Sequence, residues 1–509
     1  MAEVPAPDFT IPLPIPAPAR RSLTEAPDPG TPRAAFIAWI LTVLLLSAVV
    51  FMNQCEKPAA AKTTAPIASG STPPKLVDPL ALYGKIMVKL AHSGMVADDK
   101  ERIQLVEAID GAAETPEGRL RASLVAAEIL GPQAGLDRLK SLEESEVLNP
   151  RLGEKPTHEV PETVRLQIPF FKRVLEGDSP QLEAAEQEKF LSEHGWFAKL
   201  ALSRGLSDTD PRRAGMIAGG WRLIAVIVAA ICLLAVAFVG GLACFITGIA
   251  MASTGKLRPA FICPARGGSV YLELVAVFIA GFLLFMVGLD FFIGSFGSVP
   301  PEWSVKLHLI LQWVLLALVF WPLVRGGLSF GEFRRRLGWH GGRGVLREIG
   351  SGLFGYFACL PLLAVAMLIT VVIVLVRAAM QQSQGVDPSP PDNPIIELVS
   401  NASTLELVMI FILATCWAPL VEEAVFRGAF FRHLRSHVGV LAAAAISAVA
   451  FGVMHGYELL MLLPVMTLGF GFALMREWRG SVIACMTAHF VHNATVLSFL
   501  YAFLSILRD

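Results

Sequence analysis

Long runs of apolar residues, separated by short polar loops, fill most of the second half of this chain. One run lies near the amino terminus at 34–52, and eight more follow residue 222. Most approach the roughly 20 residues that an α-helix needs to cross a bilayer. The later runs are Leu223–Ala250, Val270–Phe292, Leu307–Val324, Ile349–Val376, Leu405–Val421, Val440–Met454, Leu459–Met475 and Val482–Leu504. The pattern predicts an all-α, polytopic membrane helix bundle of about nine spans.

The remaining segments are polar and divide the chain further. Residues 1–33 are rich in proline without helical periodicity, which predicts a disordered arm. No cleavage site follows 34–52, so this run should stay as a transmembrane anchor. Residues 56–215 are charged and place apolar positions at helical spacing, with Thr115-Pro116 as a typical helix start. We therefore expect a small helical domain at 56–215, membrane helices of unassigned role at 222–400, and a last membrane region at 403–505.

Basic residues gather in every second loop between the predicted spans. Such loops face the cytoplasm in most membrane proteins. This alternation places the amino terminus in the cytoplasm and the 56–215 domain outside the cell. The basic loop residues include Lys256, Arg258, Arg266, Arg325, Arg347, Arg432, Arg435, Arg476 and Arg479. We expect a multi-pass protein of a prokaryotic inner membrane.

Composition excludes several other classes of protein. Apolar residues make up 54% of the chain and charged residues only 17%, with a mean hydropathy of +0.58. The formal net charge of -1 gives no overall electrostatic indication of a nucleic-acid partner. The seven cysteines form no CxxC pair, so neither a disulfide framework nor a cysteine metal site is expected.

Charged residues inside an apolar run are the strongest sign of function. The stretch WAPLVEEAVFRGAFF carries Glu422, Glu423 and Arg427. Each charge costs roughly 2.5 to 3.5 kcal/mol to insert into a membrane, so its presence needs an explanation. Residues four apart share a helix face, and Glu423 can therefore pair with Arg427 in a structural ion pair. Glu422 is turned by about 100° and is left free for chemistry.

Two further polar groups lie in later spans. One is His455, which follows Phe451 by four residues, and the other is the pair His489 and Asn493, also four residues apart. A tight turn at 436–438 makes the helices before and after it antiparallel. At about 1.5 Å per residue, Glu422 and His455 then lie roughly 22 and 27 Å from that turn and can face each other.

These three motifs, in this order and spacing, resemble those of the CAAX protease and bacteriocin-processing (CPBP, or Abi) family of intramembrane endopeptidases. The resemblance covers 403–505, about a fifth of the chain. It implies that Glu422 and His455 activate a water molecule. It also implies that His489 and Asn493 stabilise the oxyanion. The implied partners are the lipid bilayer and a protein or peptide substrate within or at the membrane, with no nucleic acid.

The residue types suit peptide hydrolysis, which needs a general base for water and donors for the tetrahedral oxyanion. A zinc site is the alternative chemistry, because Glu422, His455 and His489 supply two imidazoles and a carboxylate with one open position for water. The resemblance to glutamate-dependent members favours a mechanism with no metal and no cofactor.

A non-catalytic membrane scaffold, a transporter or a bacteriocin-immunity-type protein on the same fold is the alternative function. The complete set of Glu422, His455, His489 and Asn493 favours the enzyme. A transporter would more naturally carry inverted repeats with broken helices in both halves, which the sequence does not show.

Overall fold

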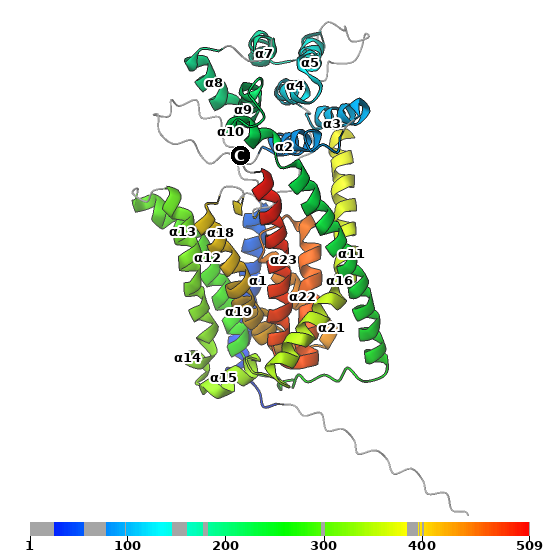
Figure 1. The fold of residues 1–509 in the computed structure, drawn as a ribbon. Coiled ribbons are helices and arrows are strands. Elements are labelled where there is room, and N and C mark those ends of the chain that lie inside the picture. The colour runs from blue at the N-terminus through cyan, green and yellow to red at the C-terminus, as the bar shows by residue number, and fades with distance from the viewer. Residues whose placement is uncertain are drawn as a thin grey trace, which may run out of the picture.

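The computed structural model describes residues 25–54, 78–96, 98–113, 115–144, 160–176, 182–296, 301–383, 395, 398–399 and 402–507. Within these ranges the secondary structure is helical and contains no strand, which confirms the predicted all-α class. Figure 1 shows an upright bundle of long helices with a group of short helices across one end. Residues 1–24 of the predicted proline-rich arm lie outside the described residues.

The predicted apolar runs form the helices of the bundle. Five are single helices: α1 (Pro32–Gln54), α11 (Gly220–Ser253), α12 (Val270–Phe296), α16 (Val345–Ser383) and α23 (Ile483–Leu507). One run is divided into α13 (Pro301–Leu311), η1 (Gln312–Phe320) and α14 (Trp321–Gly326). Another is divided into α18 (Thr404–Ile412), η2 (Leu413–Trp417), α19 (Ala418–Glu423), η3 (Ala424–Phe430) and α20 (Phe431–Arg435). The remaining two are α21 (Val440–Val453) and α22 (Leu462–Arg479), which η4 (Leu459–Met461) precedes.

The expected nine spans separate into two groups by length. Seven helical runs of the described chain are long and apolar enough to cross a membrane. α21 has 14 residues, a length of about 21 Å, which is shorter than the roughly 30 Å of a hydrocarbon core. α22 has 18 residues and ends with Arg476, Glu477 and Arg479. Protein surrounds α22, none of whose residues is exposed, whereas α21 exposes Leu441, Ile446 and Val449 on the surface of the bundle.

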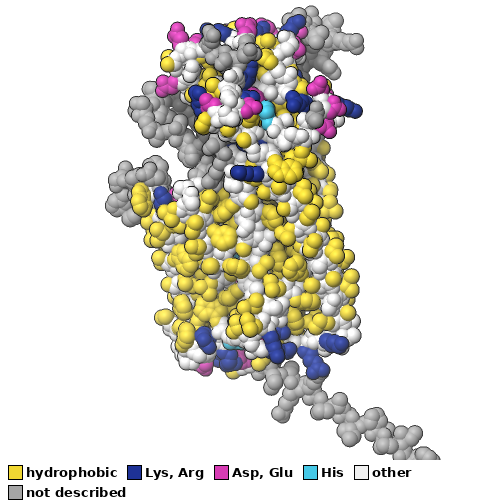
Figure 2. All heavy atoms as spheres, viewed as in Figure 1, with side chains coloured by type: hydrophobic (Ala, Val, Ile, Leu, Met, Phe, Trp, Pro, Cys, Tyr) yellow, Lys and Arg dark blue, Asp and Glu magenta, His cyan; other side chains and the backbone are white. Residues whose placement is uncertain are grey.

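The surface of the bundle is that of a membrane protein. Figure 2 shows hydrophobic side chains around its sides, with Lys, Arg, Asp and Glu gathered towards its two ends. Large apolar residues such as Leu234, Val236 and Phe291 are 65–77% exposed. A soluble protein rarely exposes an apolar patch of this extent, so the chain is a multi-pass membrane protein.

The short helices have a hydrophobic core of their own. Val88, Leu120, Phe171 and Phe197 are among the fully buried side chains of this core. The helices are α2 (Pro79–Ala91), α3 (Asp99–Ala112), α4 (Pro116–Leu130), α5 (Pro132–Glu144), α6 (Glu162–Arg165), α7 (Ile168–Leu175), α8 (Ala184–His194), α9 (Trp196–Ser203) and α10 (Pro211–Ile217). At the start of α4 the Thr115 hydroxyl accepts a hydrogen bond from the Gly118 N–H.

The segment before α1 is held against the far end of the bundle, although the sequence predicted a disordered arm up to residue 33. We call Glu25–Gly30 the strap. Both carboxylate oxygens of Asp28 accept hydrogen bonds from Arg432, at 2.8 and 2.9 Å, and Arg336 donates to Asp28 at 3.1 Å. Glu25 accepts a further bond from Arg432 at 2.7 Å. Asp28 and Glu25, which belong to the segment predicted as disordered, therefore neutralise arginines of the bundle.

Asp28→Asn should destabilise the protein, because Arg432 is only 2% exposed and would lose a charged partner. Breaking a buried ion pair costs roughly 3 to 5 kcal/mol, and we expect a value near the lower end because Glu25 still pairs with Arg432. The control is Arg335→Gln, whose side chain is 56% exposed and should contribute less than about 1 kcal/mol. Thermal unfolding of both variants in detergent is the measurement. Equal shifts in melting temperature would contradict a buried clamp.

Candidate active site

The first motif lies on the helical run from α18 to α20, where two π-helical segments interrupt the α-helix. η2 ends before the two glutamates and η3 begins directly after them. A π-helical segment has wider turns than an α-helix and recurs at functional sites. The glutamates of α19 thus lie on a short α-helical piece between two altered segments.

One carbonyl of η2 lacks a backbone donor, and a residue of the third motif supplies one. The Ala418 N–H donates to Leu413, five residues back, and Pro419 has no N–H to donate. The Ala414 carbonyl therefore receives no hydrogen bond from the backbone of residue 418 or residue 419. Asn493 on α23 donates its side-chain N–H to this oxygen at 2.7 Å. In this structure Asn493 supports the altered turn that precedes the glutamates.

Glu423, Arg427 and His489 form a buried charge cluster. Arg427 donates to Glu423 Oε1 at 3.0 Å, and both side chains are 0% exposed. His489 Nδ1 lies 2.9 Å from the same oxygen. Arg427 also donates to the Gly469 carbonyl at 3.1 Å and lies 4.1 Å from the ring centroid of Phe451. The cluster thereby joins η3 to α21, α22 and α23.

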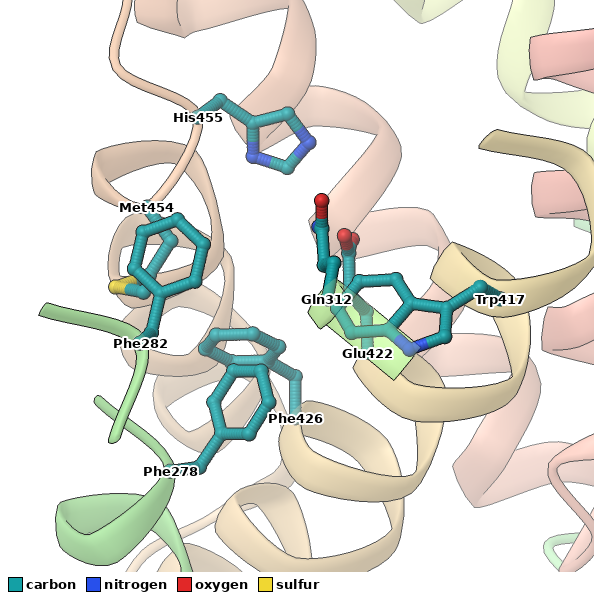
Figure 3. A pocket seen from close by; sticks show the side chains of 8 residues that line it. All are labelled: Phe278, Phe282, Gln312, Trp417, Glu422, Phe426, Met454 and His455. Carbon is teal, nitrogen blue, oxygen red and sulfur yellow. The ribbon is translucent and has the colours of Figure 1, made fainter. Parts of the chain in front are cut away.

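Glu422 makes no hydrogen bond to this cluster and lines a cavity of about 170 Å³. Its Oε2 is buried and has no hydrogen-bond partner among the described residues. Figure 3 shows the Glu422 carboxylate directed towards the His455 ring. The cavity is lined by Phe278, Phe282, Gln312, Trp417, Glu422, Phe426, Met454 and His455. Of the four proposed catalytic residues, the cavity brings Glu422 and His455 together.

His455 presents a free nitrogen to this space. Its Nδ1 lies 2.8 Å from the Phe451 carbonyl, which can only accept a hydrogen bond. Nδ1 must therefore carry the proton, and Nε2 of the neutral ring keeps its lone pair. His455 follows the end of α21 by two residues, so the short length of that helix brings the ring to the cavity.

His489 lies behind Glu422 and does not line the cavity. Because Nδ1 donates to the Glu423 carboxylate, only Nε2 can face Glu422, and it lies 4.0 Å from Glu422 Oε2. A neutral His489 has a lone pair at this nitrogen, so donation to an oxyanion requires the doubly protonated ring. Asn493 lies beyond His489 on α23 and has one of its two N–H groups bound to Ala414.

Sequence reasoning missed the wall of the cavity that lies opposite the motifs. Phe278 and Phe282 come from α12 and Gln312 from the first residue of η1. Both elements belong to the region predicted as membrane helices of unassigned role. A signal was present, since Gln312 is an uncharged polar residue within the predicted span Leu307–Val324.

In the part of the chain that the structure describes, no group of three His, Cys, Asp or Glu side chains has the arrangement of a metal site.

Comparison with known proteins identifies the last membrane region. Residues 404–495 match the family model described as type II CAAX prenyl endopeptidase Rce1-like. The match includes all three motifs, and it confirms the resemblance to intramembrane CAAX endopeptidases on this segment of less than a fifth of the chain. No curated protein and no solved structure matched the chain.

Glu423→Gln should lower stability first and activity only as a consequence, because it leaves Arg427 without its carboxylate at 0% exposure. The expected loss is roughly 3 to 5 kcal/mol for a broken buried pair. Adding Arg427→Met to this variant should recover part of the loss by removing the unpaired charge. Melting temperatures in detergent, compared with turnover per folded molecule, make the test. A Glu423→Gln protein as stable as the parent would refute the structural role.

Proposed function

We propose that this chain is an intramembrane endopeptidase that hydrolyses a peptide bond of a membrane-associated or secreted protein or peptide. The observation that supports it best is the Glu422 carboxylate, which is unpartnered on one oxygen and faces the free nitrogen of His455 in a cavity between membrane helices. A buried acceptor without a partner costs roughly 1 to 3 kcal/mol. Such a group is retained where it serves chemistry.

In the proposed reaction, a water molecule lies between Glu422 and His455 Nε2. Glu422 removes one proton as the oxygen attacks the carbonyl carbon, and the carbonyl oxygen becomes negatively charged. The tetrahedral intermediate collapses as the carbon–nitrogen bond breaks, and Glu422 returns its proton to the leaving amine nitrogen. The products are a carboxylic acid, which keeps the second proton of the water, and an amine.

His489 and Asn493 are the proposed donors to the oxyanion. His489 would donate from Nε2 as an imidazolium, which the adjacent Glu423 carboxylate stabilises at 2.9 Å. Asn493 would donate its second N–H, while the first stays on the Ala414 carbonyl. Either donation requires the bound substrate to reach the α23 side of Glu422.

We further propose that the protein lies in a prokaryotic inner membrane with a cytoplasmic amino terminus, so that α2–α10 are extracytoplasmic. The alternation of basic loops supports this orientation. A cysteine replacing Lys140, whose side chain is 68% exposed, should react with a membrane-impermeant reagent in intact cells. A cysteine replacing Arg334 at the other end of the bundle should react only after lysis. The reverse labelling pattern would show that α2–α10 are cytoplasmic.

Glu422→Gln should give a folded, membrane-inserted and inactive protein. The amide keeps the shape of the side chain but cannot accept the proton of water, so we expect a loss of at least about 10² in rate. The melting temperature should stay close to that of the parent, in contrast to Glu423→Gln. Peptide cleavage and thermal unfolding on the same preparation are the measurements. Retained turnover would remove Glu422 from the role of base.

A zinc-dependent mechanism is the alternative. Glu422→Gln would inactivate the protein in both mechanisms, because Glu422 is the base in one and a zinc ligand in the other. We expect the purified protein to carry no stoichiometric zinc and to keep its activity after treatment with a strong chelator. Elemental analysis beside the cleavage assay decides the question. About one zinc per chain, with activity lost on chelation and restored by zinc, would transfer Glu422, His455 and His489 to the role of metal ligands.

A further inference from the structure

The cavity beside Glu422 has a second wall that lies outside the family-matched segment. α12 contributes Phe278 and Phe282, and η1 contributes Gln312, whereas the matched region begins at residue 404. α12 is fixed against the motif helices, since its buried side chains share one hydrophobic core with those of η3. This wall is therefore a permanent part of the cavity.

Gln312 is the polar group of this wall. Figure 3 shows its amide end pointing, like the Glu422 carboxylate, towards the His455 ring. The side chain is partly buried, and no hydrogen bond joins it to another described residue. Trp417, only 2% exposed, lines the same cavity with an indole N–H that also lacks a partner among these residues.

These groups complement a peptide bond. The Glu422 carboxylate can only accept hydrogen bonds, and the neutral His455 ring offers an acceptor at Nε2, so neither provides a donor for a substrate carbonyl. A primary amide provides both a donor and an acceptor. Gln312 can therefore donate to a carbonyl and accept from an N–H of one extended segment, which would satisfy buried polar atoms on both partners.

The remaining wall sets the size of what can enter. Phe278, Phe282, Phe426 and Met454 are the apolar side chains that line this cavity of about 170 Å³. A cavity of about 150 Å³ with apolar walls holds one benzene molecule. The cavity thus accommodates a single large apolar side chain such as Phe, Leu or Met.

We infer that the site takes an extended peptide with a bulky apolar side chain next to the scissile bond, and that Gln312 binds the backbone of that peptide. The inference rests on the proposed function, since it names the substrate class of the same site. The aromatic wall holds the side chain, and the Gln312 amide aligns the carbonyl with Glu422 and His455. α12 and η1 thereby bind the substrate, whereas the last membrane region contributes the residues that hydrolyse it.

The test uses the full-length protein in detergent and a set of dodecapeptides that differ only in the central residue. Cleavage by the parent is measured by mass spectrometry, and retention of each peptide is measured on the inactive Glu422→Gln protein. Gln312→Leu, made in both backgrounds, removes the amide but keeps an apolar volume. Val314→Ala is the matched control, because Val314 lies on the same η1 helix and is 64% exposed.

We expect peptides with central Phe, Leu or Met to be cleaved and retained best. Gln312→Leu should lower kcat/KM and retention by about 10- to 100-fold, the range of a lost hydrogen bond to a buried group, with no fall in melting temperature. Val314→Ala should match the parent. Phe278→Ala should shift the preference towards a central Trp, which a purely structural residue would not do.

The inference would be overturned if cleavage and retention did not depend on the central residue and if Gln312→Leu had the kcat/KM and retention of the parent. Failure to retain any peptide would overturn it as well. Selective retention without cleavage by the parent would leave the peptide site standing and would instead refute hydrolysis as the proposed function.

Discussion

The buried charge cluster of Glu423, Arg427 and His489 is the constraint on which the site depends. An arginine at 0% exposure requires a carboxylate, and Glu423 supplies it from one turn earlier. The same guanidinium reaches the Gly469 carbonyl and lies against Phe451, while His489 reaches the same carboxylate from α23. Four helices are thereby fixed around one oxygen atom. Glu422, the residue immediately before Glu423, faces the cavity.

Neighbouring positions on the same helix thus have opposite environments. Glu423 accepts hydrogen bonds from a guanidinium and an imidazole through Oε1, and its Oε2 has no partner among the described residues. Glu422 forms no hydrogen bond to a described residue and lines the cavity beside His455. Glu423 and Arg427 thus balance each other's charge inside the bundle, whereas Glu422 is the acidic side chain that lines the cavity.

Sequence periodicity was enough to predict the helices and the facing of Glu422 and His455, because both follow from helical rise and from the turn at 436–438. It failed where the backbone leaves regular geometry. The π-helical turns of η2 and η3 change which residues share a face, and the bond from Asn493 to Ala414 exists only because Pro419 lacks an N–H. Gln312 was visible as a polar residue in a span, but only tertiary packing brings η1 to Glu422. The strap was predicted as part of a disordered arm, since the arginines that bind Asp28 lie 308 and 404 positions later.

That separation has a consequence for the assembly of the protein during translation. Asp28 leaves the ribosome long before Arg432, and at 5 to 20 residues per second the interval of 404 residues lasts about 20 to 80 s. During this time the strap can already bond to the start of α12, where the Ser269 and Val270 N–H groups donate to the Pro29 carbonyl. Arg336, made 308 residues after Asp28, is the first arginine to reach that carboxylate. The ion pairs of the strap are therefore completed in two stages, and a ribosome that stops before Arg432 releases a protein that has only the first of them.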